Sequence, residues 1–158
     1  MPQKSNHHLW KISRRLATLL SKSCNDEIIL SIIVTEMFFR NFFDRFLEYI
    51  TWILVGWIWK KRIARLSIGV AQIQLRHWQS MGYIDSLSPS LKSLLTVTSP
   101  SINYQACCNY LDKTGYKRGS SLLEVARLYA GKARKYYVQI LNDAWKIYNT
   151  KIDKKSIE

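Results

Sequence analysis

Glycine, proline and cysteine are scarce in this sequence, and their scarcity narrows the classes of fold and site. Six Gly and three Pro in 158 residues, beside abundant Leu, Ile, Lys and Arg, favour helices. The three cysteines are Cys24 and the adjacent pair Cys107 and Cys108, an odd count that makes a poor disulfide framework. The histidines, including the isolated His77, do not stand at the spacings of a structural zinc site, so we expect no metal and no cofactor.

Acidic residues are also few, with 11 Asp and Glu against 24 Lys and Arg, which gives a formal net charge of +13. Such a charge favours an anionic partner, namely nucleic acid, an acidic membrane or an acidic cell-wall polymer. Charge alone does not choose among them. The hydrophobic content of 47% and the aromatic content of 13% exclude a disordered chain, and the length suits one domain with its own core.

The sequence has no hydrophobic run long enough to span a bilayer. The strongest candidate, Tyr49–Trp59, is eleven residues without a charge that end at Lys60-Lys61-Arg62. A transmembrane helix needs about 20 apolar residues. We therefore expect a buried core helix here. Because Trp52, Trp57 and Trp59 stand beside a basic cluster, contact with a membrane surface is the alternative.

The N-terminal segment does not form a clear signal peptide. Its apolar patch, Leu16–Leu20, is shorter than a signal-peptide core, and Lys22 and Ser23 interrupt the chain directly after it. We interpret residues 8–22 as an amphipathic helix. The residues on its apolar face are Leu9, Ile12, Leu16, Leu19 and Leu20.

Apolar residues at helical spacing predict a mainly α, single-domain protein. Ser23 or Asn25 is the expected N-cap of a helix that runs to about Arg40, and Ser120 or Ser121 is the expected N-cap of a helix over 122–130. The other expected helices are one or two over 41–59, a short one at 91–97 inside the loop 80–101, one over 102–111, and an amphipathic one with Tyr137, Ile140, Leu141, Ala144, Trp145 and Tyr148 on one face.

Glu36 is an acid in an otherwise apolar stretch. In a helix it shares a stripe with Ile29, Ile32 and Ile33, because residues three and four apart lie on one face. Burial there would raise the pKa of the carboxyl and keep it protonated near neutrality, as a general acid requires. The structural alternative is an ion pair with Arg40, four residues on.

A second block, Ser67-x-Gly69-x-x-Gln72, comes about thirty residues after Glu36. Gly69 would let the backbone approach a ligand closely. The amide of Gln72 can both donate and accept hydrogen bonds, which suits sugar hydroxyls and acetamido groups. The structural alternative is a turn that leads into a helix.

Two further blocks continue the order, Ser101-Ile102-Asn103 with Tyr110-Leu111, and then Ala126–Gly131 with Tyr136-Tyr137 after it. Together the four blocks resemble the lysozyme-like superfamily, above all the lytic transglycosylases and goose-type lysozymes. In that family a helix-borne catalytic Glu precedes a Gly-Leu-Met-Gln-like block. A helix from Asn-Ile to Tyr-Leu and a Tyr-Asn-Gly-like turn then precede a tyrosine-containing helix. The resemblance covers roughly residues 25–148.

The resemblance implies a lysozyme-like helical fold with an active-site cleft. It also implies cleavage of the glycosidic bond between N-acetylmuramic acid and N-acetylglucosamine in peptidoglycan. Glu36 would protonate the glycosidic oxygen, while Gln72 and the backbone around Gly69 would line the cleft and hold the sugar. Ser67 would orient a substrate group or a water, and Tyr129 would pack on the cleft floor with its hydroxyl near the catalytic carboxylate.

Tyr110 is a further candidate for substrate binding. The sequence departs from the family pattern at three places: Val70-Ala71 replaces Leu-Met before the glutamine, Met37 replaces a serine after Glu36, and Ala130 replaces an asparagine. These departures bear on how the substrate fits more than on the fold.

Asp44 and Glu48 are the candidates for the second carboxylate that ordinary glycoside hydrolysis uses. Both fit an exposed helix face beside Arg40 and Arg45, since charged residues on a helix are mostly solvated. A single-glutamate mechanism that forms an anhydro sugar, the lytic transglycosylase reaction, is therefore slightly preferred over hydrolysis.

We divide the chain into a basic N-terminal helix (1–24), a lysozyme-like catalytic domain (25–148) and a polar C-terminal tail (149–158). The expected partner is the polyanionic glycan of the bacterial wall, to which a basic enzyme would be steered. We expect a monomer that acts in the periplasm or on the cell wall. The export route stays open, and a phage lysin, a secreted toxin and a housekeeping enzyme all fit.

Two other classes compete with this interpretation. A basic helical nucleic-acid-binding protein could use Arg118, Lys132, Arg134 and Lys135, although no helix-turn-helix signature occurs and a buried Glu36 would serve no purpose there. A membrane-associated protein could use residues 49–59.

Overall fold

The computed structural model describes residues 2–19, 26–117, 119–131 and 134–155, and 71% of the chain is helical. The expectation of a mainly α protein is confirmed. The elements in chain order are α1 (Pro2–Leu19), α2 (Glu27–Phe39), α3 (Phe42–Val55), α4 (Lys60–Ile63), β1 (Ser67–Ile68), β2 (Ile73–Gln74), α5 (Leu75–Ser80), α6 (Leu91–Thr98), α7 (Pro100–Lys113), α8 (Leu122–Ala130) and α9 (Lys135–Lys155).

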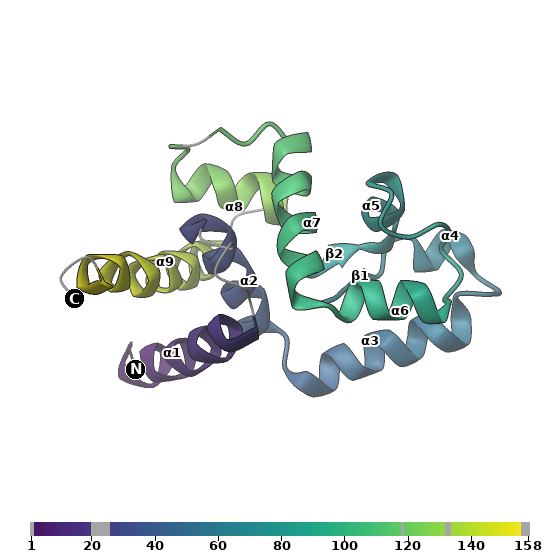
Figure 1. The fold of residues 1–158 in the computed structure, drawn as a ribbon, viewed down its shortest axis with the longest axis horizontal. Coiled ribbons are helices and arrows are strands. Elements are labelled where there is room, and N and C mark those ends of the chain that lie inside the picture. The colour runs from purple at the N-terminus through teal and green to yellow at the C-terminus, as the bar shows by residue number, and fades with distance from the viewer. Residues whose placement is uncertain (1, 20–25, 118, 132–133, 156–158) are drawn as a thin grey trace.

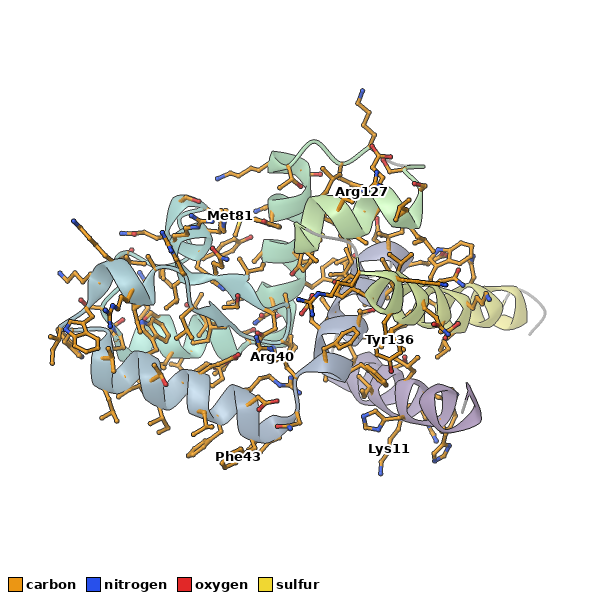
Figure 2. All side chains as sticks on the ribbon, turned by 180° about the vertical axis from the view of Figure 1, so that it is seen from behind. Lys11, Arg40, Phe43, Met81, Arg127 and Tyr136 are labelled. Atoms are coloured by element: carbon orange, nitrogen blue, oxygen red, sulfur yellow. The ribbon has the colours of Figure 1, made fainter. Side chains whose placement is uncertain are left out.

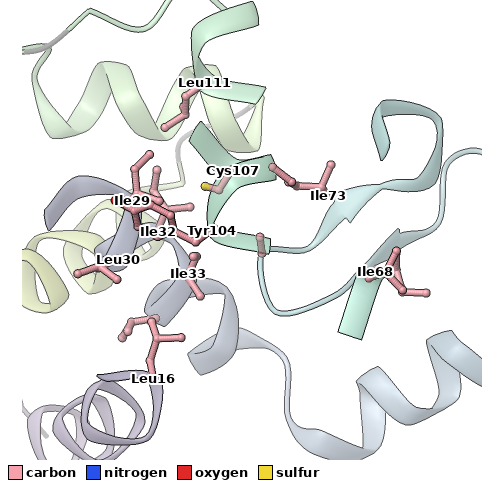
Figure 3. Close-up of a cluster of buried hydrophobic side chains, with 14 of the residues drawn as sticks. Leu16, Ile29, Leu30, Ile32, Ile33, Ile68, Ile73, Tyr104, Cys107 and Leu111 are labelled. Atoms are coloured by element: carbon pink, nitrogen blue, oxygen red, sulfur yellow. The ribbon is translucent and has the colours of Figure 1, made fainter. Parts of the chain in front are cut away.

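The helices gather in two groups on either side of α7 (Figure 1). On one side lie α1, α2, α8 and α9, and on the other lie α3 to α6 with the small β-hairpin. Within the first group α2 packs against α1 and α9, and it also contacts α7. Buried side chains from α1, α2, α7 and the hairpin meet in one core, shown by Leu16, Ile33, Cys107 and Ile73 in Figure 3.

The helix α2 is buried around most of its circumference rather than along a single stripe. Its Ile29, Ile32 and Ile33 are buried as the stripe predicts, but so are Leu30 and Val34 on other faces. A helix that is apolar all round belongs inside a core, because no face of it gains from contact with water. Two hydroxyls of α2 bond to its own backbone, from Ser31 to the Glu27 carbonyl and from Thr35 to the Ser31 carbonyl.

The N-cap of α2 is Asp26, so the expectation of Ser23 or Asn25 was wrong. The Asp26 carboxylate accepts hydrogen bonds from the backbone N–H groups of Ile28 and Ile29 at 2.9 and 3.2 Å. The sequence offers several capping residues in a row, and any one of them could satisfy the free N–H groups of the first turn. Ser23 and Asn25 lie outside the described residues.

The helix α3 contradicts the expectation of a buried core helix over Tyr49–Trp59. It ends at Val55, and within this stretch only Trp52 is a fully buried large side chain. Its indole N–H donates to the Leu87 carbonyl at 2.7 Å. The next two tryptophans, Trp57 and Trp59, are exposed. Hydrophobicity alone predicted burial, but burial requires a partner element, and Ile53 and Leu54 of α3 stay exposed because nothing in the described chain covers them.

The segment 67–74 forms a short antiparallel β-hairpin, β1 paired with β2, and α5 follows it directly in the sequence. The buried side chain of Asn103 in α7 holds the hairpin loop by a hydrogen bond. Its Oδ1 accepts from the Ala71 N–H at 3.3 Å, and its Nδ2 donates to the carbonyls of Val97 and Ser99 at 2.8 Å. One amide side chain thus ties the loop to the junction of α6 and α7.

The later helices agree with the sequence pattern. Ser121 caps α8 as expected, its hydroxyl accepting from the Glu124 N–H, and Ile140, Leu141 and Ala144 of α9 are buried. The helix α9 continues to Lys155, into the predicted tail. Leu9, Ile12 and Leu16 of α1 are buried in the same core as α2, while the side chains of Leu19 and Leu20 lie outside the described residues.

Gly69→Ala should destabilise the fold strongly. A Cβ at Gly69 would lie 2.2 Å from Asn103 Oδ1 and 2.9 Å from the Val97 carbonyl oxygen, at a φ of +81°. We expect urea denaturation to show a loss of about 3 kcal/mol or more in the free energy of unfolding. The matched control is Gly115→Ala, where φ is also positive but a Cβ would meet nothing within 4 Å. It should lose only about 1–2 kcal/mol. Equal losses would contradict a role for the contact with Asn103.

Candidate active site

A pocket opens where α2, the hairpin, α5, α7 and α8 meet. It has a volume of about 200 Å³. Arg40 lies beside it, where α2 gives way to α3 (Figure 2). The lining residues are Glu36, Arg40, Ser67, Gln72, Ile73, Gln74, His77, Tyr110, Tyr129 and Ala130.

Glu36 contributes a carboxyl group from the last turn of α2 to the pocket wall. The Tyr137 hydroxyl of α9 donates to its Oε1 at 2.8 Å. Burial raises the pKa of the carboxyl from 4.5 to about 7, while the Tyr137 hydrogen bond and the positive charge of Arg40 act in the opposite direction. The negative charge of Glu48 adds a smaller increase. Glu36 therefore keeps its proton to a higher pH than an exposed glutamate does.

The alternative of a Glu36–Arg40 ion pair does not describe the contact that Arg40 makes. The guanidinium of Arg40 pairs with Glu48, 3.1 Å from Nη1 to Oε1. The second oxygen of Glu48 accepts from the Gln72 Nε2 at 2.9 Å. Glu48 is only 9% exposed, contrary to the exposed helix face expected for it, and burial raises the pKa of its carboxyl as well.

Gln72 adopts a strained backbone conformation at the hairpin turn. Its φ is +53°, and it is the only non-glycine residue with a positive φ in the described chain. A residue other than Gly, Asn or Asp in this region is held there by its surroundings. The side-chain N–H group bonds to Glu48 and to the Gly69 carbonyl. The Oε1 atoms of Gln72 and Gln74 are buried and have no hydrogen-bond partner.

Aromatic rings also line the pocket. The ring of Tyr110 meets those of Tyr129 and His77 edge to face, with centroids 5.4 and 5.0 Å apart. The Tyr129 hydroxyl donates to the Ala71 carbonyl. The hydroxyl that donates to the Glu36 carboxyl comes from Tyr137, a contact that the sequence did not predict.

The structure brings together most of the residues that the sequence singled out. Glu36, Ser67, Gln72, Tyr110 and Tyr129 line the pocket. Three other candidates lie behind or beside it. Gly69 packs under Asn103, Glu48 lies behind Gln72, and Asp44 closes the capping box of α3 with Asn41.

Sequence reasoning missed Tyr137, Gln74 and His77 as site residues. Tyr137 stands in the predicted apolar stripe of the last helix, which places it toward the core but does not name its partner. Gln74 in β2 lines the pocket beside Gln72 of the turn. Because Gln72 has a positive φ, the alternation of side chains along a strand does not extend to it and could not have predicted this.

The chemistry available to this pocket is that of one carboxyl with a raised pKa beside polar amides and aromatic rings. Among the described residues no group of three His, Cys, Asp or Glu side chains could hold a metal ion. The Cys107 thiol lies next to Tyr129, and burial raises its pKa well above the usual value. No family model, curated protein or solved structure matches this chain.

Glu36→Gln should stabilise the protein at alkaline pH and leave stability at pH 4 unchanged. Because the folded pKa of about 7 exceeds the unfolded value of 4.5, the folded state holds the proton more tightly. The free energy of unfolding therefore falls as pH rises between these values, by up to about 3 kcal/mol. Glutamine does not titrate, so the variant should keep this stability at pH 8. Urea denaturation at pH 4 and pH 8 measures the difference. Glu124→Gln, an exposed position in α8, is the control and should not reproduce the gain.

Proposed function

We propose that this protein cleaves peptidoglycan at the glycosidic bond between N-acetylmuramic acid and N-acetylglucosamine, with Glu36 as the general acid. The observation that carries the proposal is a single carboxyl on a pocket wall whose pKa is raised to about 7. A general acid works best when its pKa is near the working pH, because it is then both protonated and able to give up the proton. The order of the four sequence blocks supports the same assignment.

The unpartnered amide oxygens support a ligand rich in hydrogen-bond donors. Buried polar atoms normally have partners, and an orphan acceptor in a pocket is satisfied when a ligand supplies the donor. Gln72 Oε1 and Gln74 Oε1 are two such acceptors. Sugar hydroxyls and acetamido N–H groups are donors of the right kind. The edges of Tyr110 and His77 add a surface against which a sugar ring can pack.

The contacts of the other acids favour a lytic transglycosylase over a hydrolase. A hydrolase needs a second carboxylate that acts as base or nucleophile. Glu48 is engaged by Arg40 and Gln72, and Asp44 by the backbone of Asn41. Neither carboxylate lines the pocket.

In the proposed reaction Glu36 gives its proton to the glycosidic oxygen as the bond from that oxygen to C1 of the muramic acid breaks. The resulting carboxylate then takes the proton of the C6 hydroxyl of the same sugar while this oxygen bonds to C1. The product is an anhydro sugar, and Glu36 is again protonated. One carboxyl group acts first as acid and then as base.

The proposal includes a lysozyme-like fold and action in the periplasm or on the cell wall. The net charge of +13 suits the polyanionic wall, and action in the periplasm or on the cell wall follows from the substrate. Ala130 lines the pocket where the family has an asparagine, so one polar contact to the sugar is absent and substrate fit should differ from that of the family.

The competing nucleic-acid assignment relied on four basic residues, of which the structure describes two. Arg134 and Lys135 are exposed at the start of α9. Arg118 and Lys132 lie outside the described residues.

Glu36→Gln should abolish clearing of purified peptidoglycan, because glutamine cannot donate the proton. We expect a loss of about 10²–10⁴-fold in the rate of turbidity decrease. Glu124→Gln makes the same chemical change on the surface and should clear normally. Mass spectrometry of the released muropeptides should show anhydro ends. If wild type and Glu36→Gln clear equally, or neither clears any wall preparation, the proposal fails. Reducing ends whose release depends on Glu48 would instead identify a hydrolase.

Tyr137→Phe should shift the alkaline limb of the pH–rate profile to higher pH. The Tyr137 hydrogen bond lowers the pKa of Glu36, so its removal raises that pKa and keeps the acid protonated further into the alkaline range. Tyr136→Phe, at the neighbouring exposed position, is the matched control and should leave the limb in place. A limb that moves to lower pH in Tyr137→Phe would contradict the proposed role of the hydrogen bond.

A further inference from the structure

The outward side of α3 exposes an unusually large apolar surface. We define the α3 face as the exposed apolar residues of this helix together with those of the turn after it. Figure 2 shows Phe43 pointing away from the body of the molecule. The residues of the α3 face and their exposures are Phe42 (82%), Phe43 (64%), Phe46 (50%), Leu47 (46%), Ile53 (38%), Leu54 (67%), Trp57 (64%), Ile58 (75%) and Trp59 (54%).

The charged and apolar side chains of α3 are arranged the opposite way from those of a helix on a water-facing surface: the charged ones are partly or fully buried and most of the apolar ones are exposed. Its three charged residues are Asp44 and Arg45, which are partly buried, and Glu48, which is buried. Glu48 points inward to Gln72. A helix at a water surface normally turns its charges outward and its apolar stripe inward. A contiguous exposed apolar surface of this kind marks an interaction site.

The chemistry at one end of the α3 face identifies the partner. Directly after Trp57 and Trp59 come Lys60, Lys61 and Arg62, all exposed. The Arg62 guanidinium lies 4.9 Å from the centre of the Trp59 ring. Between Glu48 and Asp85 the sequence contains no acidic residue. Tryptophan beside lysine and arginine, with apolar residues next to them, is the composition that binds where anionic headgroups meet acyl chains.

We propose that the α3 face binds the surface of a membrane that contains anionic phospholipids. The helix would lie in the plane of the interface, with the basic residues 60–62 among the headgroups. In the described part of the chain, no helix is long and apolar enough to cross a bilayer. A second copy of the chain fits this face less well, because the apolar surface of another α3 face would leave residues 60–62 without an anionic partner. The inference does not depend on the proposed enzymatic function.

The bound orientation leaves the pocket accessible. Glu48 and Gln72 lie on the inner side of α3, and the α3 face points the opposite way. A protein held on a membrane by this face would therefore present the pocket away from the lipid. Glycan strands could still reach Glu36.

Vesicle flotation with the full chain tests the proposal. Vesicles of phosphatidylcholine with phosphatidylglycerol should bind the protein, and vesicles of phosphatidylcholine alone should bind it much more weakly. The combined substitutions Trp57→Ser, Ile58→Ser and Trp59→Ser should reduce binding at least about tenfold. Lys60→Gln and Lys61→Gln should reduce it by about fivefold each at low salt.

Matched controls distinguish binding through the α3 face from nonspecific binding caused by net charge or by any exposed apolar residue. Arg134→Gln with Lys135→Gln removes the same charge from the start of α9 and should leave vesicle binding nearly unchanged. Leu123→Ser removes an exposed leucine of α8 and should also have little effect. Thermal melting checks that each variant is folded.

Three results would overturn the proposal. One is equal binding to both kinds of vesicle, and another is equal loss in the α9 control. The third is a dimer in solution that the combined substitutions at Trp57, Ile58 and Trp59 disrupt, without any vesicle binding.

In wild-type protein, tryptophan fluorescence should also be quenched by brominated lipids. This quenching should disappear in the variant with the Trp57, Ile58 and Trp59 substitutions.

Discussion

The burial of α2 among α1, α7 and α9 is the constraint on which the rest of the structure depends. Because apolar side chains cover nearly every face of this helix, its register is fixed, and its last turn carries Glu36 to the boundary between core and pocket. The same packing removes much of the hydration of the carboxyl and raises its pKa to about 7. Packing and acid strength thus have a common origin.

Two carboxyl groups on adjacent helices have different surroundings: burial raises the pKa of both and the charge of Arg40 lowers both, but the direct ion pair of Arg40 is with Glu48. The guanidinium at the end of α2 pairs with Glu48 of α3, and Gln72 adds a hydrogen bond to the same group. Both contacts favour the ionised form of Glu48. Glu36 receives one neutral hydroxyl from Tyr137. Carboxyl groups whose environments differ in this way can take different chemical roles, which is why Glu36 is the stronger candidate for a proton donor.

The strained hairpin turn shows how the fold holds a site in place. Asn103 binds the Ala71 N–H from one side, and Gln72 in its αL conformation reaches Glu48 from the other. Gly69 permits the close approach of Asn103. The charged side of α3 therefore serves the pocket, and its apolar side is left for contact with another surface. In the two proposals, one helix therefore has two functional faces.

The positions of most helices, the choice of Ser120 or Ser121 as the cap of α8, and the place of Glu36 on a stripe with buried isoleucines could be predicted from the sequence alone. These properties depend on neighbours three or four positions away, so periodicity predicts them. Only the tertiary structure decided that Tyr137, 101 residues from Glu36, donates to it. It also decided that Arg40 pairs with Glu48 and that the apolar side of α3 stays uncovered. These outcomes depend on which elements pack together, and local spacing carries no information about packing over such distances.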